Sequence, residues 1–312
     1  GLQLAIEAAK KNPEAVSELT SFGAAARTAE PLVVSLLSHA SPTVRLSAIG
    51  ALGAVGAAES APALTPLLAD PVDWRVPCAA ARALVTLGAA QSVSAIEALA
   101  REHWYPPVRD CARTAAAALK SGGRAEPQSH LWDVPDGKKW RHPPPNGDPE
   151  PNALSAAELA KETVPSETGA RKPRLPAQTG LKFADGLLLG TDQGEWGGRL
   201  IWKGPRGEKT LVASDFRGDT TPLASNVVAL HSFGAFAVSL HGLGHMSINE
   251  GTAYRIDRAA DGSVVATLWR VLPGEPERSS RLPDGSVFIS CRGGDVVLSP
   301  DGRLRMASEW KP

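Results

Sequence analysis

Three histidines and a glutamate in the last third of the chain are residue types that bind transition metals. His241 and His245 stand four residues apart in the segment HGLGHMSINEG, and His231 lies ten residues upstream. Zinc requires three convergent protein ligands with a carboxylate or water as the fourth, and Glu250 is the nearest carboxylate. His241 is expected at the end of a strand and His245 in the following glycine-flanked loop, which gives no framework to aim them together. The spacing therefore favours hairpin-end histidines held by hydrogen bonds over a metal site.

A second group of reactive residue types lies in the segment GTDQGEWGGRL, residues 190–200. Asp192 and Glu195 are carboxylates of the kind that glycosidases use as a paired acid and base. Nothing near them supplies specific sugar-binding subsites, and the glycines predict a tight, bulged turn with Trp196 packed against the core. An exposed Trp196 beside these acids would instead give the loop the composition of a binding surface.

Motifs of well-known enzyme classes are absent from the sequence. It contains no G-x-S-x-G, no G-x-x-x-x-G-K-[ST], no H-E-x-x-H and no EF-hand loop. A hydrolase with Asp192, Glu195, His241 and His245 in one cleft stays open as the alternative, because an enzyme needs such side chains to converge on one pocket. The missing motifs favour a non-enzymatic protein with no catalytic residues, no cofactor and no metal.

The first 121 residues repeat with a period of 32. Residues 43–56, 75–88 and 107–120 superpose, and the segment EAVSELTSFG begins a more degenerate unit before them. Apolar residues recur at spacings of three and four, prolines stand where helices would begin, and glycines follow the last periodic residue. The pattern predicts about four stacked helical hairpins, an α-solenoid over residues 1–121.

These repeats resemble the HEAT-repeat family in its short bacterial form. The resemblance rests on the leucine pairs Leu36–Leu37 and Leu67–Leu68, followed by Val44–Arg45 or Val108–Arg109 and then by Ala-Leu and Gly. Pro77 replaces the expected arginine in the second unit, so an arginine ladder would be interrupted there. The resemblance implies a curved stack of helices that binds partners on its concave face, or a packing scaffold with no ligand of its own.

The three cysteines are Cys78, Cys111 and Cys291. An odd count without C-x-x-C spacing argues against a disulfide framework and against a zinc site. Cys78 and Cys111 are expected on neighbouring helices whose spacing is about 8–10 Å, beyond the roughly 7 Å limit for bridged Cα atoms. The sequence therefore predicts three free thiols, which favours a reducing compartment such as the cytoplasm; a leader removed before Gly1 would allow a periplasmic or secreted location.

Residues 122–179 are rich in proline and polar residues and predict an extended connector between two domains. Within it, the segment NALSAAELAKET predicts a short helix with Ser155 as its cap and Glu158 three residues on, which is a capping box. Trp132 and Trp140 are expected to dock the connector on one of the domains, because tryptophan side chains favour burial.

Residues 180–312 predict an antiparallel β domain. Asp-Gly pairs stand beside short apolar runs, which is a strong hairpin signal. Residues 186–213, 235–268 and 286–308 share one plan, in which an apolar strand is followed by a glycine-led second strand, a glycine turn and a third strand. The fold class is thus a multidomain α + β chain, with an α-solenoid followed by an all-β domain.

The β repeats resemble propeller blades of the PQQ-repeat or WD-repeat kind, and the segment DGSVFISCRGGDVVLSPDGRLRMA carries the best match. Propellers usually close with four to eight blades, whereas three repeats are visible here. A partial or very small propeller, a β-sandwich and a barrel therefore all stay open. The resemblance extends to architecture, since the metal ligands of quinone-dependent enzymes are not found.

Charge and hydropathy restrict the class of partner. The chain has 33 basic and 33 acidic residues, and the balance holds within each of the three predicted segments. No segment has the basic excess that nucleic-acid binding needs, and no apolar run approaches the roughly 20 residues that span a bilayer. Frequent alanine and arginine suggest a bacterial protein. The expected partner is another protein, which this chain would bind as a scaffold or as an inhibitor or immunity-type binder.

We expect the binding surface on one rim of the β domain. The loops 192–198 and 241–250 leave equivalent strands of the repeat, and loop 291–294 occupies the third equivalent position, so all three should emerge on the same side. Substitution of Trp196 or of Arg292 by alanine is expected to weaken partner binding, because both residue types are enriched at hot spots. The predicted binding residues are Asp192, Glu195, Trp196, His241, His245, Glu250 and Arg292.

Overall fold

The computed structural model describes residues 1–39, 41–56, 58–122, 147–166, 173–214, 220–223, 225–245 and 248–310. The chain divides into two compact units, one helical and one built from β-strands. An α region is thus followed by a β region, as the sequence predicts. Within the described part of residues 1–122 no strand occurs, which supports the repeat interpretation.

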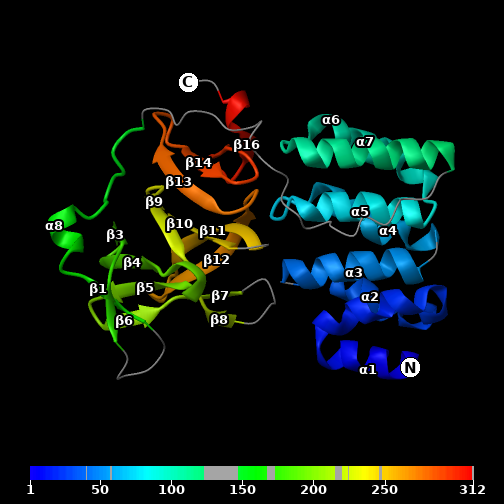
Figure 1. The fold of residues 1–312 in the computed structure, drawn as a ribbon, viewed down its shortest axis with the longest axis horizontal. Coiled ribbons are helices and arrows are strands. Elements are labelled where there is room, and N and C mark those ends of the chain that lie inside the picture. The colour runs from blue at the N-terminus through cyan, green and yellow to red at the C-terminus, as the bar shows by residue number, and fades with distance from the viewer. Residues whose placement is uncertain are drawn as a thin grey trace. The chain divides into compact units, whose positions relative to one another are not determined.

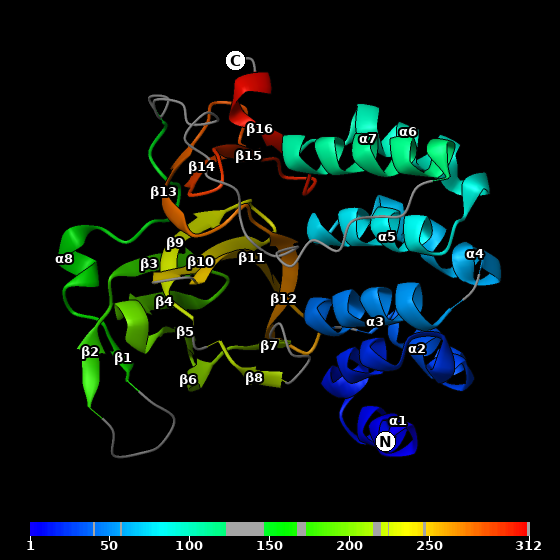
Figure 2. The same ribbon diagram turned by 45° about the vertical axis from the view of Figure 1, so that its right-hand side comes forward.

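The helical unit is a stack of helix pairs. Helices α3, α5 and α7 lie next to one another in one layer (Figure 1), and α2, α4 and α6 pack against them as their pair partners, which Figure 2 shows from a second direction. Four of the prolines stand in the first turn of a helix, as expected. The α-helices are α1 (Leu2–Lys11), α2 (Glu30–Leu36), α3 (Pro42–Val55), α4 (Ala61–Leu64), α5 (Arg75–Thr86), α6 (Val93–Glu102) and α7 (Pro106–Ser121), and the 3₁₀ segments are η1 (Pro13–Ala29), η2 (Ala58–Ser60), η3 (Thr65–Ala69) and η4 (Ala90–Ser92).

One hydrogen-bonded motif recurs in the first and third of the superposed repeats. The guanidinium of Arg45 donates to the carbonyl oxygen of His39 at 3.0 Å, and Arg109 donates to that of His103 at the same distance. In the middle repeat prolines occupy both equivalent positions, 71 and 77. There the fully buried carboxylate of Asp73 pairs with Arg75 at 2.7 Å instead. The arginine ladder is therefore interrupted at Pro77, and a local ion pair replaces it.

The prediction that Cys78 and Cys111 are unbridged is wrong. The two residues form a disulfide between α5 and α7, with their Cα atoms 6.0 Å apart. The expected spacing of 8–10 Å applies to helix axes, and each Cα lies about 2.3 Å from its axis. Two Cα atoms on facing surfaces can therefore approach to roughly 3.4–5.4 Å, so a separation of 6.0 Å is within reach and within the range that a disulfide spans. Cys291 is the free cysteine and is buried in the β unit, so the argument for a reducing compartment loses its basis.

The β unit contains three four-stranded antiparallel sheets, and in each sheet the strands neighbour one another in chain order. The three sheets correspond to the three predicted repeats, with β3, β9 and β13 as their first strands. The strands of the sheets are β3 (Thr179–Phe183), β4 (Gly186–Asp192), β5 (Gly198–Gly204), β6 (Gly207–Thr210), β9 (Val227–Ser232), β10 (Ala237–His245), β11 (Ile248–Arg258), β12 (Val264–Val271), β13 (Pro276–Arg281), β14 (Val287–Cys291), β15 (Val296–Leu298) and β16 (Leu304–Met306), and two further pairs are β1 (Thr163–Pro165) with β2 (Arg174–Pro176) and β7 (Val212–Ser214) with β8 (Thr220–Pro222).

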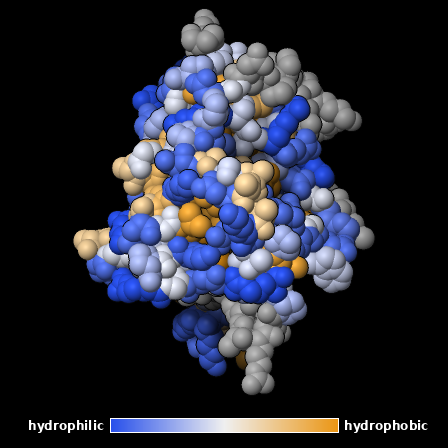
Figure 3. Space-filling view, turned by 90° about the vertical axis from the view of Figure 1, so that its left-hand side faces the viewer, coloured by the Kyte–Doolittle hydropathy of each residue, from blue (hydrophilic) through white to orange (hydrophobic). Residues whose placement is uncertain are grey.

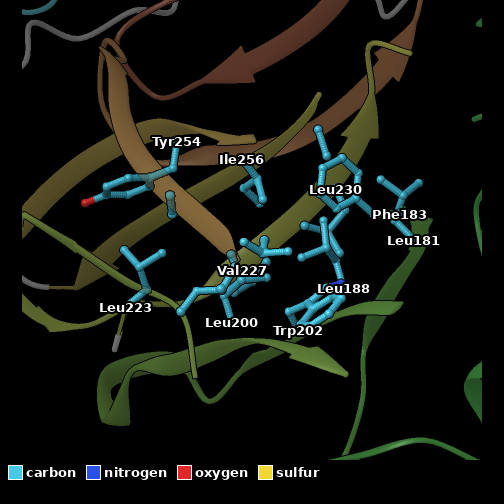
Figure 4. Packing of buried hydrophobic residues seen from close by; sticks show 14 residues of the cluster. Leu181, Phe183, Leu188, Leu200, Trp202, Leu223, Val227, Leu230, Tyr254 and Ile256 are labelled. Atoms are coloured by element: carbon cyan, nitrogen blue, oxygen red, sulfur yellow. The ribbon is translucent and has the colours of Figure 1, made fainter. Parts of the chain in front are cut away.

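Strand β9 lies at the centre of the β unit. It contacts β3 and β4 of the first sheet and β13 of the third. Its Val227 and Leu230 belong to the main core between the first and second sheets, together with Leu188, Trp202 and Ile256, as Figure 4 shows. Burial of such side chains contributes about 1.5–3 kcal/mol each, so the sheets are held together chiefly by this apolar contact.

The described part of the connector packs on the outer face of the first sheet. Helix α8 (Ala156–Leu159) begins with the predicted capping box, in which Ser155 accepts from the Glu158 amide and Glu158 accepts from the Ser155 amide. Leu159 packs with Val164 and Leu189 in a second apolar cluster. The predicted docking tryptophans at 132 and 140 lie outside the described residues. On the face in Figure 3, hydrophobic residues appear as small areas between hydrophilic ones.

Reduction of the Cys78–Cys111 disulfide should destabilise the helical unit. A bridge that closes a loop with a sequence separation of 33 restricts the unfolded chain and is expected to contribute about 3–4 kcal/mol. The unfolded, unreduced protein should show one free thiol, and a reductant should lower the urea midpoint of the helical transition. In the Cys78→Ser/Cys111→Ser double variant the reductant should have no effect. Three titrated thiols would contradict the bridge.

Candidate functional site

The loop that follows strand β4 is a fixed structure with an exposed tryptophan. Asp192 accepts from the amide of Gly194 at 2.8 Å. The buried side chain of Asn226 accepts from the amide of Gln193 at 3.1 Å and donates to the carbonyl oxygen of Gly194 at 2.8 Å. Trp196 is 81% exposed. The prediction of a tight turn is confirmed, but the expected packing of Trp196 against the core is wrong, because its side chain lies on the surface.

The segment 241–250, predicted as a loop, is mostly β-hairpin. Strand β10 continues to His245, and β11 begins at Ile248, opposite it. The glycines that predict a loop serve close packing instead. A Cβ atom at Gly244 would collide with the side chains of Glu275 and Arg292, and one at Gly251 would collide with the carbonyl oxygen of Gly274. Glycine is required because the backbone before β13 passes directly over this face of the hairpin.

His241 lies inside the sheet and not on the rim. Its side chain is fully buried, with Nδ1 at 2.8 Å from the Ser225 hydroxyl and Nε2 at 2.9 Å from the Ser239 hydroxyl. Its ring also packs edge-on against Tyr254, with centroids 5.0 Å apart. Burial lowers the pKa of His241 to about 4, so the ring is neutral at pH 7. The placement of His241 on the accessible rim is therefore wrong, because β10 extends past it.

Three of the other predicted residues, Glu195, His245 and Arg292, are linked through the end of β10. Glu195 lies 3.2 Å from Nε2 of His245, at the end of β10. From the third loop, Arg292 lies 3.4 Å from the carbonyl oxygen of Gly244 and 2.8 Å from the carboxylate of Glu275. The loops 192–198 and 291–294 thus both reach the end of β10, as the repeat predicts. Because His241 is buried elsewhere, the four residues of the hydrolase alternative do not meet in one cleft.

We use the term rim for the residues around this end of the hairpin, where His245 and Arg292 lie on opposite faces because side chains alternate along β10. Its apolar part includes Ile248, which is 42% exposed and stands opposite His245 in the hairpin register. The sequence reasoning missed Ile248 because segment 241–250 was interpreted as a loop, in which no strand register exists. Carboxylates outnumber basic groups on the rim, which therefore has acidic character. The rim consists of Asp192, Glu195, Trp196, His245, Ile248, Glu250, Glu275, Glu277 and Arg292.

The described residues also answer whether the chain has a metal site or a membrane-spanning helix. Within the described ranges, no group of three or more His, Cys, Asp and Glu side chains is arranged to hold a metal ion. In the same part of the chain, no helix combines the length and the apolar character needed to cross a membrane. His231, the remaining histidine of the initial group, lies on β9 between Glu150 and Ser279.

Comparison with known proteins identifies the helical region. A family model described as HEAT repeats matches residues 9–77 and 29–120. These matches confirm the predicted resemblance over the N-terminal region. No curated protein and no solved structure shows significant similarity to the chain. The structure shows that the β unit consists of antiparallel sheets. Because the family match does not reach this unit, its resemblance to propeller blades stays a prediction.

Acid should destabilise the β unit through His241. An unfolded histidine titrates near pH 6.5, whereas the pKa of folded His241 is about 4. Between these values the unfolded state binds a proton that the folded state excludes. The stabilisation present above pH 6.5 is therefore lost as the pH falls, by about 2–3 kcal/mol between pH 7 and pH 4.5.

The measurement is urea unfolding at pH 7, 5.5 and 4.5. The His241→Gln variant should be less stable at pH 7 and should lose this part of the pH dependence. His245→Gln is the matched control, because His245 is half-exposed on the same strand. Equal pH dependence in the wild type and in His241→Gln would contradict the assignment.

Proposed function

We propose that this chain is a binding protein that uses the HEAT region as a protein-interaction scaffold and the rim as a second, non-catalytic contact surface. HEAT matches over residues 9–120 support the scaffold role, because stacked helical repeats present extended surfaces to other proteins. The observation that carries the rim is the exposure of Trp196. A tryptophan that is 81% exposed on a fixed loop presents the residue type that is most enriched at interface hot spots.

The composition of the rim indicates the chemistry of its partner. Trp196 and Ile248 offer apolar surface, and the carboxylates of Asp192, Glu195 and Glu250 stand around it. A lysine or arginine over the Trp196 ring would gain a cation–π contact, and the nearby carboxylates would attract the same positive charge. We therefore expect a partner segment that presents a basic side chain next to an apolar one.

The rim is preorganised, which lowers the entropy cost of binding. Asn226 fixes the backbone of the loop that carries Trp196. Glu195 pairs with His245, and Arg292 pairs with Glu275, so the neighbouring segments hold one another in place. Exposed pairs of this kind contribute little stability, and their value here is to fix the geometry around Trp196.

The binding role can take several forms. A scaffold that joins two partners and an inhibitor or immunity-type protein that covers one partner are both compatible with this surface. The hydrolase alternative at the rim has less support, because only Glu195 and His245 approach each other there and His241 is engaged with Ser225 and Ser239.

Trp196→Ala should weaken capture of the protein's partner by about 2 kcal/mol or more, a loss of roughly 30-fold in affinity, with an unchanged melting temperature. Tagged wild type and variant would be used for affinity purification from cells of the source organism, with quantification by mass spectrometry. Titration of synthetic peptides with Lys-Leu or Arg-Leu pairs would test the partner's chemistry directly.

Two comparisons make the result specific. Val265→Ala removes an apolar side chain with 42% exposure outside the rim and should leave capture unchanged. Arg292→Ala should weaken capture as well, because Arg292 is a predicted binding residue of a type that is enriched at hot spots. A lower melting temperature of Trp196→Ala, or equal capture by Trp196→Ala and Val265→Ala, would mean that the rim is ordinary surface.

A further inference from the structure

Three residues that are far apart in the sequence are joined in series by two hydrogen bonds outside the rim. Nδ1 of His231 lies 2.7 Å from a carboxylate oxygen of Glu150, and Nε2 of His231 lies 2.8 Å from the hydroxyl of Ser279. Glu150 comes from the connector, His231 from β9 and Ser279 from β13. We call these three residues the triad.

The chemistry of the partners fixes the tautomer of His231. An ionised carboxylate only accepts hydrogen bonds, so the proton of the neutral ring resides on Nδ1, which faces Glu150. Nε2 then carries the lone pair and accepts from the Ser279 hydroxyl. This is the arrangement in which an imidazole acts as general base toward a serine while a carboxylate orients it and stabilises the imidazolium.

The carboxylate of Glu150 is fixed in its place. Its second oxygen accepts from the amide of Ser232 at 2.7 Å, and the guanidinium of Arg281 lies 3.6 Å away. The connector backbone is anchored next to it, because the amide of Asp148 donates to the carbonyl oxygen of Arg281 at 2.9 Å. The amide and the guanidinium hold this oxygen in place, so the other oxygen of Glu150 faces His231 in a fixed orientation.

His231, the central residue of the triad, is its most buried member. The side chain of His231 is 6% exposed and that of Glu150 is 16% exposed, so the base and the acid are largely withdrawn from water. Ser279 is only partly buried and lies on β13, which is the edge strand of its sheet. Because one side of an edge strand has no neighbouring strand of its own sheet, this is the side from which we expect a small reactant to approach Ser279.

The edge position of β13 also supplies a backbone donor. The amide of Leu282 points toward β14, where it donates to Ser286, and the carbonyl of Arg281 points the other way, toward Asp148. Because the backbone groups of alternate residues share a direction in an antiparallel strand, the N–H of Ser279 points away from β14, as the groups of Arg281 do. We infer that the N–H of Ser279 is available to donate to an oxyanion formed at that serine.

We propose that Ser279 is an activated nucleophile that accepts the acyl group of small, activated carboxylic esters. The Ser279 oxygen attacks the carbonyl carbon while its proton moves to Nε2 of His231. The bond to the leaving alcohol breaks, and His231 returns the proton to that oxygen. Water then attacks the acyl–serine ester with the same proton transfers, which releases a carboxylic acid and restores Ser279.

This inference goes beyond binding at the rim and does not depend on it, because the two sites share no residue. The local motif search misses the triad, since Ser279 stands in the sequence ERSSR and the acid and base lie 129 and 48 residues before it. Ser279 lies on β13, and β9 packs next to that strand. We restrict the substrate to small esters because a large one would collide with the neighbouring strand.

The test is labelling of the intact, folded protein with an alkyl fluorophosphonate, whose fluoride the serine oxygen displaces. Peptide mass spectrometry should find one phosphonyl group on Ser279. The labelling rate should fall about 100-fold or more in His231→Gln and at least about tenfold in Glu150→Gln. p-Nitrophenyl acetate should give a burst of nitrophenol that Ser279→Ala lacks.

Ser280→Ala is the matched control. Ser280 is the next residue of β13, and its buried hydroxyl has no hydrogen-bond partner among the described residues, so its removal should leave labelling unchanged. Circular dichroism verifies that each variant is folded, and Glu150→Gln, which preserves the size of the side chain, provides the second test if His231→Gln is unfolded.

Three results would each overturn the proposal. Ser279 of the folded wild type would remain unlabelled at a probe concentration that labels trypsin, or it would react no faster than in protein unfolded with urea. A folded His231→Gln or Glu150→Gln variant that labels at the wild-type rate would equally show that the triad only links the connector to the sheets.

Discussion

Both candidate sites of the β unit depend on hydrogen bonds that satisfy buried polar side chains at the two ends of strand β9. At one end, Asn226 precedes the strand and binds the backbone of the loop that carries Trp196. At the other end, His231 is hydrogen-bonded to both Glu150 and Ser279. A buried amide or imidazole without partners would cost about 1–3 kcal/mol. The same bonds that avoid this cost therefore fix the loop and the triad to one rigid strand.

The length of β9 separates the two sites. A strand of six residues spans about 20 Å at roughly 3.3 Å per residue. The apolar side chains between its ends, such as Val227 and Leu230, belong to the main core. Trp196 and the triad therefore lie about one strand length apart, whereas Glu277, at the other edge of the rim, stands two residues before Ser279 on β13.

The helical unit combines a repeated pattern with local exceptions. The pair Arg45–His39 and the pair Arg109–His103 form the same contact one repeat on either side of the middle unit. In the middle unit both partners are replaced together by prolines, which leaves no unpaired guanidinium behind. The disulfide joins this irregular unit to the next one through α5 and α7. A covalent bond thus stabilises the part of the stack where the arginine contact is lost.

The sequence alone determined the elements with strong periodicity. The helices of residues 1–121, the three β repeats and the capping box at Ser155 all follow from local spacing, because helix and strand periods and caps are properties of neighbouring residues. It also determined that loops 192–198 and 291–294 emerge together, since equivalent loops of a repeat share one side. These features need no knowledge of what packs against them.

Only the tertiary structure decided the rest, because the deciding contacts join residues far apart in the chain. The glycines of segment 241–250 have the local signature of a loop, yet Gly244 and Gly251 lie in strands whose face is covered by residues 274–276. The disulfide depends on the distance between facing surfaces of two helices, which the repeat period does not specify. The triad joins positions 150, 231 and 279, and no local pattern reveals it because the connector and two sheets must pack together to form it.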